Sequence, residues 1–187
     1  MIPLFITLGV LILLTLFFVG VFNGLVRRRN QMKNAWAQID VQLKRRYDLI
    51  PNLVETVKGY VKHERETLES VTNARNLAQQ ISGSSVGARA KAEGELSSAL
   101  SKLLAVVENY PDLKANQNFL ALQEELSSTE NKISFSRQFY NDSVLQLNNQ
   151  IQMFPSNLVA GMTGFTNGEF FEVAVSTERE APKVKFS

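Results

Sequence analysis

The chain has 187 residues, of which 44% are hydrophobic and 20% are charged, and its formal net charge is +2. This length suffices for one globular domain, and the absence of cysteine excludes disulfides, thiolate metal sites and a cysteine nucleophile. The small net charge hides a gradient, because residues 27–65 carry a net charge of +6 and residues 66–187 carry −4.

An uncharged stretch stands at the start of the chain. Residues 2–26 read IPLFITLGVLILLTLFFVGVFNGLV, and as a helix they would measure roughly 37 Å, enough to cross a hydrocarbon core of about 30 Å. A signal peptide would have a basic beginning, a shorter apolar part and a small-residue cleavage site, none of which is present. We therefore predict a transmembrane anchor over residues 1–28, in contact with the lipid bilayer through residues 2–26.

Basic residues follow this anchor directly, namely Arg27, Arg28, Arg29 and Lys33. Because basic residues resist translocation, they predict a single-pass protein with a short external N-terminus and a cytoplasmic body. The same charges have a second interpretation, adhesion to an anionic membrane surface at about 1 kcal/mol per charge. We favour the first interpretation, in which they set the topology and otherwise lie on a solvated helix face.

From Trp36 to Ile81 the apolar residues recur at steps of three and four, which predicts a long helix over residues 31–81 with a narrow apolar seam. Such a rod would be roughly 75 Å long, more than the later helices can cover. Either it breaks at Pro51, with Asp48 capping a new helix, or its uncovered seam is buried between subunits.

Two further helices are predicted. Residues 81–87 read as a loop, residues 88–109 as the second helix, and Pro111 stops that helix and precedes a third over residues 112–154 that ends before Pro155. The seams and their breaks predict an all-α bundle of three to four long antiparallel helices over residues 29–158.

The last part, residues 159–187, is rich in glycine and aromatic residues. Apolar and polar residues alternate at Phe171, Val173 and Val175, and again at Val184 and Phe186, which predicts short strands. A two-stranded ribbon is marginal alone, so these segments must pair within the chain or with another subunit, be covered by a helix, or form a loose tail.

The sequence contains few of the residues and motifs that form catalytic or metal-binding sites in other proteins. His63 and Glu64 resemble the start of a zinc motif, but position 67 is Thr67 and the chain has no second histidine. Phosphate-binding loops and a nucleophilic serine turn are absent, and the basic stretch at 27–46 has too few aromatics for nucleic-acid binding. We predict no catalytic, cofactor-binding or metal-binding residue and no nucleic acid as partner. The alternative is a metal or ligand site built from oxygen ligands of Glu64, Glu124 and Glu130.

Polar residues in or beside the apolar seams form the most unusual feature. An unpaired buried charge is prohibitively costly, so those that face inward should pair across helices and fix the register. We expect Arg137 to pair with Glu64, Asp48 or Glu130. The full set of polar residues is Arg46, Asp48, Asn52, Glu64, Arg75, Glu130, Asn131, Arg137, Asn141 and Asn148.

Several strings together resemble the LemA family: WAQIDVQLKRRYDLIPNLVETVKGYVKHE, YPDLKANQNFLALQEELSSTENKI, SRQFYNDSV and the closing FP. The resemblance covers essentially the whole chain, with departures at Ser128, where glutamate is frequent, and at Leu147, where tyrosine is usual. It implies a small bacterial protein of the cell (inner) membrane, with one N-terminal span and a cytoplasmic bundle of long helices. It brings no settled activity, and one branch of relatives takes part in magnetosome formation.

Two functional hypotheses follow. The first is a self-associating structural or adaptor protein of the membrane, a homo-oligomer without catalytic activity that offers a surface to another membrane or envelope protein. The second is a metal- or ligand-handling domain that uses the seam carboxylates.

Overall fold

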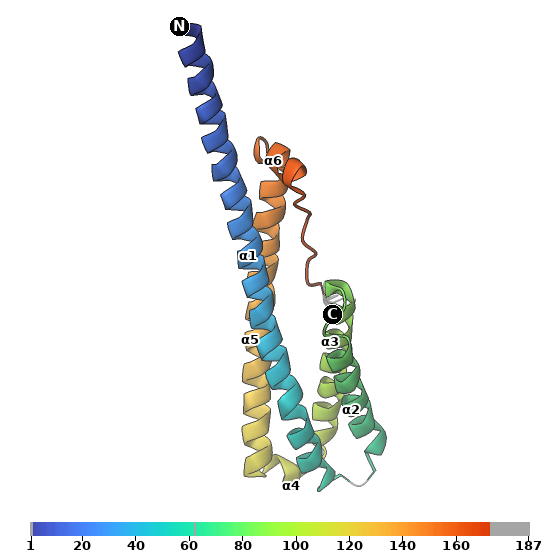
Figure 1. Ribbon diagram of the computed structural model, residues 1–187. Helices are drawn as coiled ribbons and strands as arrows, with labels where there is room; N and C mark the ends of the chain where they lie inside the picture. Colours follow the sequence, from blue (N-terminus) through green and yellow to red (C-terminus); the bar gives the residue numbers. More distant parts are fainter. Residues whose placement is uncertain (1, 62, 173–187) are drawn as a thin grey trace, which may run out of the picture. The chain divides into compact units, whose positions relative to one another are not determined.

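The computed structural model describes residues 2–61 and 63–172, and within them it is helical without a strand (Figure 1). The helices are α1 (Ile2–Lys58), α2 (Arg65–Gln80), α3 (Val86–Val107), α4 (Pro111–Lys114), α5 (Gln117–Gln152) and α6 (Ser156–Thr163). The all-α prediction is confirmed for this part of the chain. The predicted strands lie mostly outside the described residues, and Phe171, which is described, belongs to no strand.

The chain divides into two compact units that both contain parts of α1 and α5. The first unit combines residues up to Asp40 with Ser134–Phe170, and the second combines Val41–Ile133 with the segment from Phe171. The predicted division at residues 28 and 158 falls inside helices, since α1 is continuous through the first position and α6 crosses the second.

In the first unit, α1 and α5 run antiparallel. Arg28 of α1 contacts Gln146 of α5, and further along α1 the ring of Trp36 lies 5.1 Å from the ring of Tyr140. A later residue of α1 therefore contacts an earlier residue of α5, as in antiparallel helices. The apolar seams meet between them, with Ala35, Ile39, Tyr140, Val144 and Leu147 buried.

The chain after α6 is hydrogen-bonded to α5 in the same unit. Gly164 ends α6 in the left-handed conformation at φ 71°, which a glycine adopts without steric cost. Asn148 of α5 then donates to the Gly168 carbonyl at 3.1 Å and accepts from its N–H at 2.8 Å. A Cβ at Gly168 would lie 2.7 Å from the sulfur of Met32, so a larger residue there would require the flexible end of the Met32 side chain to shift.

The second unit contains residues 41–58 of α1, all of α2, α3 and α4, and residues 117–133 of α5. Helices α2 and α3 pack side by side as a hairpin (Figure 1). The Ser85 side chain caps α3 by accepting from the Ala88 N–H, and Asn116 accepts from the Phe119 N–H at the start of α5. The core of this unit comes from all of these elements and includes Leu43, Ile50, Leu53, Val57, Val71, Ala78, Leu96, Leu103, Leu113 and Phe119.

The predicted break at Pro51 is wrong, because α1 continues through this proline and ends at Lys58. Proline has no N–H for the Tyr47 carbonyl one turn earlier. The Nε–H of Arg75 in α2 donates to that carbonyl at 2.9 Å instead. A side chain from a different helix therefore replaces the missing helical bond, and Asp48, expected to cap a new helix, is exposed within α1.

The other two prolines lie at helix boundaries, as predicted. Pro111 begins α4 after α3 has ended at Val107, and Pro155 separates α5 from α6. The rod predicted over residues 31–81 is divided after Lys58, close to Gly59, and resumes as α2 at Arg65. The second unit thereby contains four long helical segments, from α1, α2, α3 and α5, together with the short α4, without a break at Pro51.

Candidate functional site

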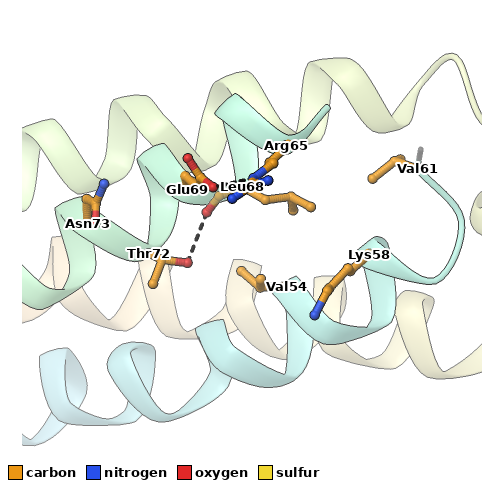
Figure 2. Close-up of a pocket in the computed structure, with 8 residues that line it drawn as sticks. All are labelled: Val54, Lys58, Val61, Arg65, Leu68, Glu69, Thr72 and Asn73. Atoms are coloured by element: carbon orange, nitrogen blue, oxygen red, sulfur yellow. Dashed lines mark hydrogen bonds and ion pairs between the residues drawn. The ribbon is translucent and has the colours of Figure 1, made fainter. Parts of the chain in front are cut away.

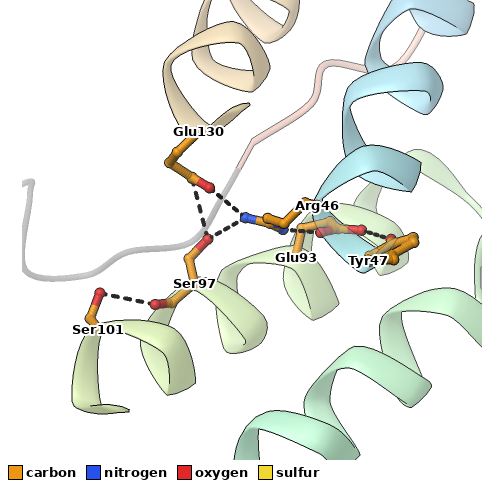
Figure 3. A network of polar contacts seen from close by, with 6 residues as sticks. All are labelled: Arg46, Tyr47, Glu93, Ser97, Ser101 and Glu130. Carbon is orange, nitrogen blue, oxygen red and sulfur yellow. Dashed lines mark hydrogen bonds and ion pairs between the residues drawn. The ribbon is translucent and has the colours of Figure 1, made fainter. Parts of the chain in front are cut away.

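Among the described residues of the second unit, the most deeply buried charged group is the guanidinium of Arg46. Its side chain is 1% exposed, and it comes from the apolar seam of α1. It forms an ion pair with Glu93 of α3, and it donates to Glu130 of α5 at 2.7 Å and to the Ser97 hydroxyl at 2.9 Å (Figure 3). One side chain of α1 therefore binds polar groups of two other helices.

Both carboxylate oxygens of Glu93 are occupied. One accepts from Arg46 and the other from the Tyr47 hydroxyl, and the Glu93 side chain is 4% exposed. Burial raises the pKa of the Tyr47 hydroxyl well above its ordinary value, and the bond to Glu93 raises it further. Tyr47 therefore stays protonated and acts as a permanent donor to the buried carboxylate.

These contacts have a structural role, because they connect α1 to α3 and α5. A buried ion pair contributes little net stability, but removing one partner leaves a charge without compensation, so such a pair selects one arrangement of the helices. Each oxygen of the Glu93 carboxylate accepts a hydrogen bond from a side chain of α1. We call Arg46, Tyr47, Glu93, Ser97 and Glu130 the Arg46 network.

The predicted polar set is distributed over both units. Arg46 and Glu130 meet in the Arg46 network, Arg75 supports α1 at Tyr47, and Asn148 holds Gly168. Glu64 is half-buried and accepts from the Tyr110 hydroxyl at a long 3.5 Å. The remaining members differ in exposure, with Asp48, Asn52 and Asn131 exposed and Arg137 and Asn141 half-buried.

The expected pairing of Arg137 stays a prediction. Arg137 belongs to the first unit, whereas Glu64, Asp48 and Glu130 belong to the second, in which Glu130 binds Arg46. Sequence reasoning missed Glu93 and Ser97. Glu93 could have been found, because it lies three residues before Leu96 on the apolar face that continues to Leu103.

A groove lies between the end of α1 and the start of α2 in the second unit, with a volume of about 550 Å³ (Figure 2). Its apolar lining consists of Val54, Val61 and Leu68. Arg65 and Glu69 form an ion pair at 2.6 Å along its edge, and Lys58 lies on the other side. The groove combines an apolar surface with charges of both signs, as a surface that receives another polypeptide does.

The N-terminal part of α1 differs from all of these regions. Each residue from Ile2 to Phe17 is exposed, although the segment is almost entirely apolar. Among the described residues, α1 is the one helix long and apolar enough to cross a membrane. Arg27, Arg28, Arg29 and Lys33 follow it as exposed residues.

Comparison with known proteins identifies the family. A model of the LemA family matches residues 35–186. The chain belongs to the LemA family. The resemblance seen in the sequence is therefore confirmed, and its two most specific strings, DLIPNLV and YPDLKAN, correspond to α1 around Pro51 and to the region of α4.

Individual relatives are distant. The chain is 29% identical to Protein LemA of Metamycoplasma hominis over 84% of its own length and 71% of that protein. It is 24% identical to Magnetosome protein MamQ 2 of Paramagnetospirillum magneticum over 81% of its length, and 22% identical to Magnetosome protein MamQ of Magnetospirillum gryphiswaldense over 80%. The chain spans 64% of either magnetosome protein, less than two thirds of their length.

Neither the family nor these relatives' names denote an enzyme. Within residues 2–61 and 63–172, no group of three histidine, aspartate or glutamate side chains gathers in a way that could hold a metal ion. Glu130 is bound to Arg46, Glu64 lies beside Tyr110, and Glu124 is exposed. The oxygen-ligand site considered from the sequence thus has no geometric support in this LemA-family chain.

Proposed function

We propose that this LemA-family chain is a single-pass membrane protein with a structural or adaptor role and no catalytic activity. The observation that carries the proposal is the exposure of residues 2–17. A water-soluble protein does not leave such a continuous apolar surface uncovered, whereas a bilayer covers it without cost.

The topology follows from the charges beside this surface. Arg27, Arg28, Arg29 and Lys33 are exposed at one end of the apolar segment, and the other end carries none. Basic residues are retained on the cytoplasmic side. The N-terminus is therefore external and the helical body is cytoplasmic, at the inner membrane of a bacterial cell.

The body offers surfaces for self-association. Phe135 and Phe139 lie one helical turn apart on α5, with 72% and 42% of their area exposed. The groove beside Val54 and Leu68 is a second apolar surface. Large exposed aromatic residues at helical spacing are typical of protein interfaces, so we expect a homo-oligomer that also receives another membrane or envelope protein.

Light scattering of the purified full chain in detergent tests this function. We expect a mass of several protomers after subtraction of the detergent. Phe135→Asp should reduce that mass, because it places a charge in the proposed contact. Asn118→Asp is the matched control, since it adds the same charge at an exposed position of the same helix, 17 residues before Phe135, and should leave the mass unchanged. A monodisperse monomer of the parent chain would refute self-association.

A further inference from the structure

Helix α6 packs against the end of the apolar segment of α1. Val159 and Ala160 of α6 form a buried cluster with Leu25, and Phe18, Val21, Phe22, Ile151 and Phe165 pack around it. The rings of Phe22 and Phe165 meet edge to face with their centroids 6.0 Å apart. All of these residues belong to the first unit, and they fix one face of α6 against α1.

The residues on the outer side of this packing are large and apolar. Phe154 is 79% exposed, Met162 78%, Met153 63% and Leu158 59%. The stretch of sequence that contains them has no charge, because no aspartate, glutamate, lysine or arginine occurs in residues 143–168. We call Met153, Phe154, Leu158 and Met162 the α6 apolar surface.

The length of the uncovered part of α1 determines what surrounds this surface. Residues 2–17, 16 in all, measure roughly 24 Å as a helix, which is less than a hydrocarbon core of about 30 Å. A span of about 20 residues reaches to Val21 or Phe22. These are residues on which α6 packs, so a bilayer crossed by α1 extends to the level of α6.

The charges next to this level fit the boundary of a bilayer. The guanidinium of Arg29 lies over the ring of Phe165, 4.9 Å from its centroid. Arg28 shares with Met153 and Phe154 the lining of a hollow of about 360 Å³. Basic groups beside apolar side chains match anionic headgroups above acyl chains.

We propose that the α6 apolar surface is inserted into the boundary layer of the same bilayer that α1 crosses, in contact with lipid acyl chains. This inference rests on the proposed membrane anchoring. The chain then has two membrane contacts, one spanning and one lateral, and α6 fixes how deep the first unit sits. Phe154, Leu158 and Met162 are the residues that contact lipid.

Spin labels on single introduced cysteines test the proposal, because the chain has no cysteine of its own. The full chain carries Met162→Cys or Phe154→Cys, with Leu11→Cys as a reference within the span and Asp142→Cys as an exposed reference on α5. Each variant is reconstituted in vesicles of phosphatidylethanolamine and phosphatidylglycerol. Collision rates with oxygen, which enters the bilayer, and with a water-soluble nickel chelate are measured.

We expect the oxygen-to-nickel ratio at positions 154 and 162 to exceed that at position 142 severalfold and to approach that at position 11. A ratio at 154 and 162 equal to that at 142, with position 11 in the bilayer, overturns the α6 contact alone. Protection of 154 and 162 from both reagents also overturns it and indicates cover by a second copy of the chain. A label at position 11 that meets nickel freely overturns the membrane anchoring as well.

Discussion

The two units have opposite patterns of burial, with apolar residues exposed in the first and charged residues buried in the second. In the first unit, residues 2–17 and the outer residues of α6 leave apolar side chains exposed, and residues 143–168 contain no charge. In the second unit, Arg46 and Glu93 are charged and almost completely buried. This difference reflects the surroundings of each region. The exposed apolar surface requires a non-aqueous medium, and the buried charges require partners within the protein.

The largest effect is expected at the centre of the Arg46 network. Arg46→Met leaves the Glu93 carboxylate buried with one donor, and removal of one partner from a buried pair costs about 3–5 kcal/mol. We expect a lower denaturant midpoint for the loss of helicity in the full chain. The double variant Arg46→Met, Glu93→Leu should regain part of this loss, because the one carboxylate that still lacks Arg46, that of Glu130, is 48% exposed to solvent. Equal midpoints for the single variant and the parent would show that the pair is not buried as described.

A smaller effect is expected from Tyr47→Phe, which removes only the hydroxyl donor to Glu93. A hydrogen bond to a charged group is worth about 1.5–3 kcal/mol. The pKa of Tyr47 is raised in the folded chain, so its contribution is complete below the ordinary tyrosine pKa of 10.0 and decreases as the pH rises above that value. Unfolding measured from pH 8 to 11 should show a steeper loss of stability in the parent than in Tyr47→Phe. Parallel pH profiles would exclude this coupling.

The support of α1 at Pro51 can be tested with a double-mutant cycle. Arg75→Met removes the donor to the Tyr47 carbonyl, and an unsatisfied buried acceptor costs about 1–3 kcal/mol. In a Pro51→Ala background the N–H of the new alanine can bind that carbonyl, so the same change should cost about 1 kcal/mol less. If the cost is the same in both backgrounds, Arg75 does not replace the missing helical bond.

The smallest effect is expected for the exposed pair of Arg65 and Glu69. Their side chains are 89% and 57% exposed, so solvent screens the attraction. Glu69→Gln should leave the unfolding midpoint nearly unchanged, in contrast to Arg46→Met. A large loss of stability would mean that the exposed pair of Arg65 and Glu69 contributes as much as the buried pair of Arg46 and Glu93. It would weaken the comparison between buried and exposed charge.

The sequence predicted much of this fold because periodicity is a local signal. The seam from Trp36 and the helix ends near Pro111 and Pro155 were predicted, and so was the apolar helix at the N-terminus. The break at Pro51 was wrong because the compensating group, Arg75, comes from another helix, 28 residues after the Tyr47 carbonyl that it binds, and local rules do not include it.

The candidate site was predicted in part. Arg46 and Glu130 were singled out as seam charges, but Arg46 was not assigned its partners, because Glu93 and Ser97 lie on a helix whose rotation is set only by packing. The α6 apolar surface was missed for a similar reason. Phe154, Leu158 and Met162 recur at steps of four, a spacing that is equally typical of a buried helix face, and their exposure becomes evident only when Val159 and Ala160 are seen to face α1.

Extraction of bacterial membranes with alkaline carbonate tests the central claim, that residues 2–17 anchor this chain in a bilayer, most directly. The full chain is compared with a chain that begins at Phe18 and so keeps the residues on which α6 packs. We expect the full chain to stay in the membrane pellet and the shortened chain to be released, because a lateral contact alone does not resist this treatment. Release of the full chain into the supernatant would show that residues 2–17 do not anchor it in a bilayer.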